Sequence, residues 1–298
     1  MITHPHLGGK IAGDRQREML ATAERQRLVR QLRAQARASR SADRTGWAEF
    51  RAEYDRVHRP LWQEFNAWYT AQGAAPLPDL EFIAEGDVNL YVYPELADYR
   101  RELQLGPAWH RLDSSVRRTD ERFTLPPTLA GRDGALIYFS LGSLGSADTG
   151  LMRRVISCLA ATPHRYIVSK GPLHNEIELA PNMWGAEFVP QTSVLQLADL
   201  VITHGGNNTT TECLHFGKPM IVLPLFWDQY DNAQRMDELG FGVRLDTYGF
   251  TEAQMHEALD RLLADGALRG RLASAGQSIR ARDGVVRAAA LIEGAAAG

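Results

Sequence analysis

The sequence predicts an α/β protein in which residues 133–298 form a doubly wound parallel sheet, preceded by a largely helical segment over residues 1–132. In the second part, short apolar runs alternate with helical stretches, which is typical of a parallel sheet covered by helices on both faces. The first part instead contains long runs with helical spacing. A Pro-rich stretch over residues 125–132 separates the two parts and is the predicted domain junction.

The first part opens with a charged stretch that predicts a weakly packed helix over residues 14–40. Residues 1–60 carry thirteen Lys and Arg against seven Asp and Glu, whereas the remainder is acidic. These arginines alternate with Glu and Gln at helical spacing and carry no zinc-finger or RNA-binding signature. The pattern therefore favours a solvated helix face over a nucleic-acid contact, and we expect no nucleic-acid partner.

An aromatic stripe predicts a second, amphipathic helix between residues 47 and 69, where large apolar side chains recur every three or four positions. Such stripes usually pack in a core, and the alternative is that this one lines an acceptor groove. Pro76 and Pro78 end the helix, and residues 88–93 predict a strand that ends at Pro94.

Beyond the junction, the elements of the sheet are predicted one by one. We expect strands at residues 136–141, 166–169, 200–203, 220–223 and 242–245, and helices near residues 150, 192, 208, 232 and 251. The Ala-rich end, residues 285–298, predicts a terminal helix with a frayed tail. In sheets of this kind, ligands bind at the carboxyl ends of the strands.

The composition restricts the class of protein further. Cys158 and Cys213 lie far apart without a CxxC spacing, so neither a disulfide framework nor a zinc site is predicted, and a reducing cytoplasm fits best. The amino terminus lacks the pattern of a secretion signal, and no apolar run approaches the roughly 18 residues needed to span a bilayer. We therefore expect a cytoplasmic protein without a membrane span.

The most informative motif is LVITHGGNNTTTE, residues 200–212, in which a buried strand leads through two glycines into a helix. Gly205 and Gly206 allow a tight turn and close backbone approach. The polar run Asn207–Thr209 consists of cap-type residues whose amides meet an anion at a helix start. His204, at the end of the strand, is placed to donate to a phosphate oxygen. The motif predicts a cradle for a diphosphate.

Three other segments supply partners for this cradle. FVPQ offers Phe188, an aromatic ring for stacking on a base, and Gln191, an amide for its edge. The Asp228–Gln229 pair follows a strand and suits sugar hydroxyls. In YFSLGS, Gly142 and Ser143 end the first strand of the second part and predict further backbone access to phosphate.

In this order and spacing, the FVPQ, HGGNNTTTE and DQ motifs resemble the donor-binding signature of the UDP-glycosyltransferases, an inverting GT-B family. The resemblance implies that Phe188 stacks on uracil, that Gln191 lies near the base or ribose, and that Glu212 binds the ribose hydroxyls. Gly205 and Asn207 stand where the plant signature has Cys and Trp, which is typical of the bacterial, macrolide-type branch.

For the rest of the donor, the resemblance places His204, Asn208 and Thr209 on the diphosphate and Ser143 against phosphate. It assigns the transferred sugar to the Asp228–Gln229 pair. Because a carboxylate on the ribose favours a ribonucleotide, we expect a UDP-sugar over a dTDP-sugar donor. No D-x-D pair occurs, and helix dipole and His204 would stabilise the leaving group, so we expect no metal and no cofactor.

The implied fold is GT-B, with a carboxy-terminal Rossmann-like domain at 133–298 and an incomplete, largely helical amino-terminal acceptor domain at 1–132. Compared with the family, we expect roughly the first 100 residues to be absent, together with the histidine that deprotonates the acceptor. His4 and His6 lie in no strand-end loop, so the sequence predicts no acceptor-activating residue.

Two classes of function remain open on the sequence alone. The first is a hexosyltransferase of natural-product glycosylation, which moves a sugar from a UDP donor to a small hydroxyl-bearing acceptor with inversion. The second is a non-catalytic nucleotide-sugar-binding module, or a truncated transferase that binds UDP without turnover. A UDP-sugar epimerase of the same architecture is a third and weaker alternative.

Overall fold

The structure is a computed structural model that describes residues 45–99, 105–116 and 122–297. The helix predicted over residues 14–40 lies outside the described residues. The chain divides into two compact units, residues 1–89 and 90–298. We describe each unit by itself.

The described part of the first unit is dominated by helix α2 (Thr45–Ala71), which confirms the amphipathic helix expected from the aromatic stripe. No described side chain of α2 is fully buried, and Leu61 and Trp68 are each 58% exposed. The helix contacts the segment that follows it, where the ring of Phe65 lies 5.9 Å from that of Phe82. The aromatic side chains of α2 therefore pack partly against the residues that follow the helix, and none of those described is enclosed in a core.

The next elements are two short strands that pair with each other. Strand β1 (Asn89–Tyr91) lies within the strand predicted over residues 88–93. Its partner β2 (Trp109–Arg111) was not predicted, because Trp109 is the only apolar residue among its three.

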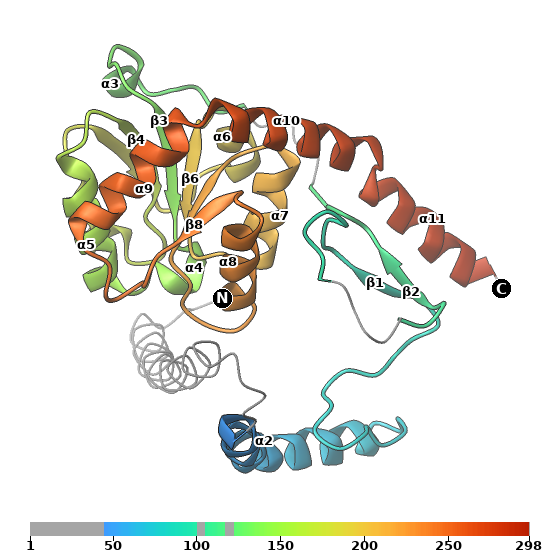
Figure 1. Ribbon diagram of the computed structural model, residues 1–298. Coiled ribbons are helices and arrows are strands. Elements are labelled where there is room, and N and C mark those ends of the chain that lie inside the picture. Colours follow the sequence, from blue (N-terminus) through green and yellow to red (C-terminus); the bar gives the residue numbers. More distant parts are fainter. Residues whose placement is uncertain (1–44, 100–104, 117–121, 298) are drawn as a thin grey trace, which may run out of the picture. The chain divides into compact units, whose positions relative to one another are not determined.

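The main sheet of the second unit has six strands in the order β5-β4-β3-β6-β7-β8, and every neighbouring pair is parallel (Figure 1). Its strands are β3 (Leu136–Ser140), β4 (Arg165–Ser169), β5 (Met183–Ala186), β6 (Leu200–Thr203), β7 (Met220–Val222) and β8 (Gly242–Arg244). The doubly wound sheet is thus confirmed, and the five predicted strands agree with the observed bounds to within one residue.

Strand β5 is the member of the sheet that the sequence did not indicate. It contains Gly185, whose missing side chain is required, since a Cβ there would lie 2.4 Å from the carbonyl oxygen of Val168 on β4. Glycine weakens the pattern by which a strand is recognised in the sequence. The close approach of two strands therefore explains why this strand was missed.

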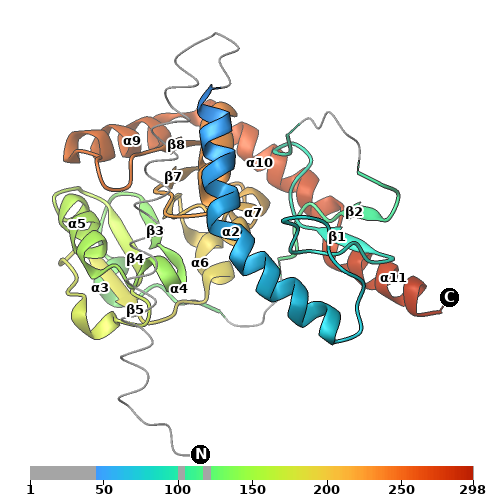
Figure 2. The same cartoon turned by 90° about the horizontal axis from the view of Figure 1, so that it is seen from below.

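Helices cover both faces of the sheet (Figures 1 and 2). One face carries α5 and α9, and the other carries α6, α7 and α8. The helices of the second unit are α3 (Pro127–Ala130), α4 (Gly142–Gly145), α5 (Thr149–Ala160), the 3-10 turn η1 (His174–Glu176), α6 (Gln191–Leu197), α7 (Asn207–His215), α8 (Gln229–Glu238), α9 (Glu252–Ala264), α10 (Gly266–Ala281) and α11 (Gly284–Ala297). The terminal helix was predicted and continues to Ala297, whereas α10 was not predicted.

Helix α10 was not predicted because it is rich in glycine. One of these glycines has a packing role. A Cβ at Gly276 would lie 2.8 Å from the carbonyl oxygen of His215, at the end of α7. The missing side chain allows α10 and α7 to pack closely. Glycine lowers helix propensity by about 1 kcal/mol, so a helix that depends on such contacts is poorly marked in its sequence.

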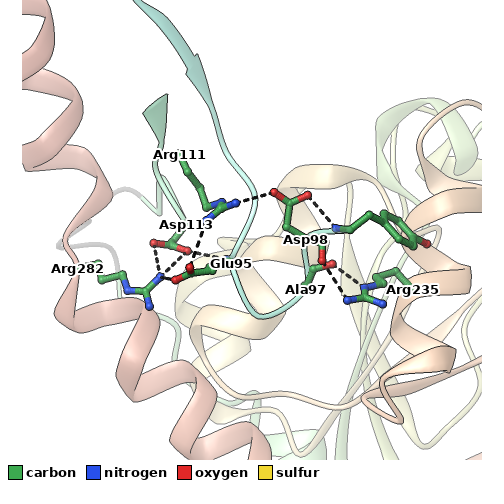
Figure 3. Close-up of polar contacts among 8 residues, drawn as sticks. Glu95, Ala97, Asp98, Arg111, Asp113, Arg235 and Arg282 are labelled. Atoms are coloured by element: carbon green, nitrogen blue, oxygen red, sulfur yellow. Dashed lines mark hydrogen bonds and ion pairs between the residues drawn. The ribbon is translucent and has the colours of Figure 1, made fainter. Parts of the chain in front are cut away.

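Two arginines, one on α8 and one directly after α10, bond to residues on either side of β2 (Figure 3). Arg235 of α8 donates from Nε to the carbonyl oxygen of Ala97 at 2.8 Å and from Nη2 to that of Asp98 at 3.0 Å. Arg282, which ends α10, donates to both carboxylate oxygens of the buried Asp113 at 3.0 and 3.1 Å. These contacts attach Ala97, Asp98 and Asp113 to the domain that carries the main sheet.

Candidate functional site

A cavity of about 570 Å³ opens at the carboxyl ends of β3 and β6. These two strands lie side by side at the point where the chain changes direction across the sheet, and such a switch point is where open α/β sheets bind ligands. The lining residues are Tyr138, Ser140, Gly142, Ser143, Ser169, Gly171, Phe188, Val189, Gln191, Thr192, His204, Gly206, Asn207, Asn208, Thr209, Glu212 and Asp228. The cavity therefore brings together eleven of the thirteen predicted residues, and Gly205 and Gln229 lie outside its lining.

His204 follows β6 and lies between two glycines. A Cβ at Gly206 would lie 2.6 Å from the ring nitrogen Nε2, and a Cβ at Gly142 would lie 2.8 Å from the ring carbon Cε1. Gly142 also has a φ of +72°, a conformation that other residues rarely adopt. Because neither glycine has a side chain, the imidazole can occupy the space between them. A Cβ at either position would collide with the ring.

The protonation state of His204 follows from this enclosure. Burial lowers its pKa from 6.5 to about 4, and a hydrogen bond with the backbone of Ser140 opposes the shift only in part. The imidazole is therefore neutral at pH 7. A neutral imidazole still donates one N–H, so His204 can meet a phosphate oxygen as a donor but without a positive charge.

The start of α7 has its backbone amides at the same end of the cavity. Helical hydrogen bonding begins with the N–H of Thr210, which donates to the carbonyl oxygen of Gly206 at 3.0 Å. The N–H of Asn207 donates to Oδ2 of Asp228 at 3.0 Å. The N–H groups of Asn208 and Thr209 have no intrahelical acceptor, because they belong to the first turn. Two amides and the positive end of the helix dipole are thus available for an anion.

Asn207 also connects the cavity with the segment that follows β1. Its side-chain Nδ2 donates to the carbonyl oxygen of Val92 at 3.0 Å. The side chain that the sequence assigned to the diphosphate cradle is therefore already bonded to the backbone of another segment. The backbone of residues 92–98, to which Arg235 also bonds, contributes in this way to the position of the helix start.

The cavity lining also contains a hydrogen-bonded group of side chains around Gln191. Its amide nitrogen donates to Oε2 of Glu212 at 2.5 Å and to the hydroxyl of Thr209 at 3.3 Å. Its amide oxygen accepts from the hydroxyl of Tyr138 at 3.0 Å. Phe188 lines the same cavity and is 67% exposed, which leaves its ring face accessible for stacking.

Asp228 and Gln229 both make hydrogen bonds within the chain. The Asp228 carboxylate accepts hydrogen bonds from the backbone of Asn207 and from the side chain of Asn232, each at 3.0 Å. Gln229 is buried, and its Oε1 accepts from the backbone of Leu225 at 2.9 Å, which closes the loop before α8. Asp228 lines the cavity, whereas Gln229 supports the loop, and their role in holding a sugar stays a prediction.

Gly205 has a conformational role beside the cavity. Its φ is +82°, and a Cβ would lie 2.6 Å from a methyl carbon of Val222 on β7. Any side chain here would have the wrong backbone conformation and would collide with the neighbouring strand. The glycine therefore makes the turn between β6 and α7 possible.

Six residues of the lining were not predicted: Tyr138, Ser140, Ser169, Gly171, Val189 and Thr192. Ser140 and Ser169 are the last residues of β3 and β4, so the rule that ligands bind at carboxyl ends of strands would have found them. Tyr138 lies inside β3, and the sequence gives no sign that separates it from the core residues of that strand. In the structure it is almost fully buried.

Two of the four histidines in residues 1–132 lie in the part of the chain that the structure describes. His4 and His6 lie outside the described residues. His58 lies on α2, where its ring stacks on that of Tyr54 with centroids 3.9 Å apart. His110 is partly buried in β2.

Cys158 and Cys213 are both buried and unpaired, and burial raises the pKa of each thiol, which keeps it protonated. None of the helices in residues 45–99, 105–116 and 122–297 is long and apolar enough to cross a membrane.

The parallel sheet, its strand order and the cavity at its switch point are those expected of a domain of the GT-B type. Comparison with known proteins agrees. Residues 154–282 match the family described as erythromycin biosynthesis protein CIII-like, C-terminal domain. The solved structure of the glycotransferase of kitacinnamycin is similar with a TM-score of 0.65 and 26% identity, over 81% of this chain and 66% of that chain.

Curated glycosyltransferases are also similar to this chain. The NDP-glycosyltransferase YjiC of Bacillus subtilis (strain 168) is 32% identical over 164 residues, which are 54% of this chain and 42% of that protein. The uncharacterized UDP-glucosyltransferase YojK of the same organism is 23% identical over 235 residues, 78% of this chain and 57% of that protein. The chain thus spans about half the length of these relatives, and its resemblance to the UDP-glycosyltransferases is confirmed.

Proposed function

We propose that the chain binds the nucleoside diphosphate of a UDP-sugar in the cavity and transfers the sugar to a hydroxyl of a small-molecule acceptor, with inversion. The diphosphate would lie at the start of α7, against the amides of Asn208 and Thr209 and the imidazole of His204. The uridine would lie at the other end, with Phe188 on the base and Glu212 on the ribose.

One observation carries this proposal: a single cavity is lined both by anion-binding groups and by an accessible aromatic ring with a carboxylate. A diphosphate needs donors and a positive dipole, whereas a nucleoside needs an aromatic face and an acceptor for its ribose hydroxyls. The relatives named UDP-glucosyltransferase and NDP-glycosyltransferase have names that agree with such a donor.

Calorimetric titration with UDP tests the donor site. We expect His204→Ala to weaken binding by about 1 to 3 kcal/mol, roughly 5- to 150-fold, which is the usual cost of losing a hydrogen bond to a charged group. His256→Ala is the matched control, because His256 bonds to the carbonyl of Cys158, and neither residue lines the cavity. Unchanged affinity of His204→Ala would remove His204 from the site.

Turnover is tested separately, with the same protein, a UDP-sugar and a panel of phenols and polyketides. Release of UDP that depends on the acceptor supports transfer. Binding of UDP without release would favour a nucleotide-sugar-binding module, and sugar isomers formed without an acceptor would favour an epimerase.

We also propose that transfer needs no metal, since helix amides and His204 would stabilise the leaving diphosphate. Loss of turnover on addition of a chelator would contradict this.

A further inference from the structure

Tyr138 connects the core of the sheet with the nucleoside end of the cavity. It lies in the middle of β3, its side chain is almost fully buried, and its hydroxyl reaches the cavity lining. There it donates to Oε1 of Gln191 at 3.0 Å. Ser140 and Ser169, at the ends of β3 and β4, line the same cavity.

The chemistry of these groups fixes the direction of every hydrogen bond between Tyr138 and Glu212. A carboxylate only accepts hydrogen bonds, so Gln191 must present its NH₂ group to Glu212, 2.5 Å away. The amide oxygen of Gln191 then faces Tyr138, where it needs a donor, and the phenol O–H supplies one. The Tyr138 hydroxyl thereby holds the amide of Gln191 in the orientation that binds Glu212.

We infer that Tyr138 is a positioning residue that, through Gln191, orients the Glu212 carboxylate for the ribose hydroxyls and so determines the preference for a ribonucleotide over a deoxyribonucleotide. This inference rests on the proposed function, because it places the nucleoside of the donor beside Glu212. Tyr138 itself need not touch the ligand. Without its hydroxyl, the amide of Gln191 can rotate and Glu212 loses a fixed position.

The test compares the affinities for UDP and 2′-deoxy-UDP, because their ratio reports on ribose recognition and not on general stability. We expect the wild-type chain to bind UDP at least about tenfold more tightly than 2′-deoxy-UDP. Tyr138→Phe, which removes one oxygen and keeps the ring, should reduce this ratio about fivefold. This is the change in an equilibrium constant that the loss of one hydrogen bond typically causes. Gln191→Leu should reduce it as well, and tests the same path without a change in the sheet core.

Tyr166→Phe is the matched control for loss of a buried tyrosine hydroxyl. Tyr166 lies on β4, is fully buried, and bonds through its hydroxyl to Thr162 at 2.6 Å, away from the cavity lining. Its variant should keep the wild-type ratio. A wild-type ratio retained by both Tyr138→Phe and Gln191→Leu would overturn the inference while leaving the proposed function intact. Failure of the wild-type chain to bind either nucleotide would overturn both.

Discussion

Acidification should destabilise the protein through His204, and the expected size follows from its surroundings. The unfolded chain titrates this histidine near pH 6.5, whereas the folded chain does so at about pH 4 because the ring is enclosed. Between these values the unfolded state binds a proton that the folded state does not. The free energy of unfolding therefore falls as the pH falls through this window, and above pH 6.5 the effect vanishes.

The magnitude comes from the difference between the two pKa values of His204. Each pKa unit corresponds to about 1.4 kcal/mol, so full acidification below pH 4 would remove roughly 3 kcal/mol of stability through this residue. Between pH 7 and pH 5, where the folded protein is still largely unprotonated at His204, the loss should be about 2 kcal/mol.

Urea unfolding at pH 7 and pH 5 measures this loss for the wild-type chain and for His204→Gln. We expect the wild-type stability to fall by about 2 kcal/mol more than that of the variant, because the variant has no group to protonate at this position. Burial also lowers the pKa of His164 and His215, but both histidines are present in both proteins and cancel in the comparison. Equal losses in the two proteins would refute the enclosed, neutral imidazole.

Two further predictions concern the attachment of residues 112–114 to the start of α11. A Cβ at Gly284 would lie 2.1 Å from two carbonyl oxygens of that segment, so Gly284→Ala should destabilise the chain by about 1 to 3 kcal/mol in thermal unfolding, although Ala is the better helix former. Gly294→Ala, in open space on the same helix, should instead be neutral or stabilise by up to about 1 kcal/mol, and equal behaviour of the two variants would contradict the packing argument. Arg282→Ala should cost about 1 to 3 kcal/mol in urea unfolding, because it leaves the buried carboxylate of Asp113 without its guanidinium, and a cost near zero would show that water replaces the arginine.

Local sequence determined much of this fold. Continuous apolar runs such as residues 200–203 are long enough to be recognised and are buried on both faces of the sheet, so their strands were predicted almost to the residue. The turn from β6 into α7 was also predictable, because positive φ at Gly205 and polar cap residues leave a local signature. Strand β5 and helix α10 were missed, since glycines required by contacts with distant backbone weaken the local pattern.

For the candidate site, the sequence by itself determined which segments meet, because parallel strands end at one edge of the sheet and bring their loops together. Only the tertiary structure decided what each side chain does there. It directs Gln229 into the supporting loop and joins Tyr138 to Glu212 through Gln191. It also encloses His204 so that its imidazole is neutral. Hydrogen-bond partners and burial depend on residues far apart in the chain, and no local pattern encodes them.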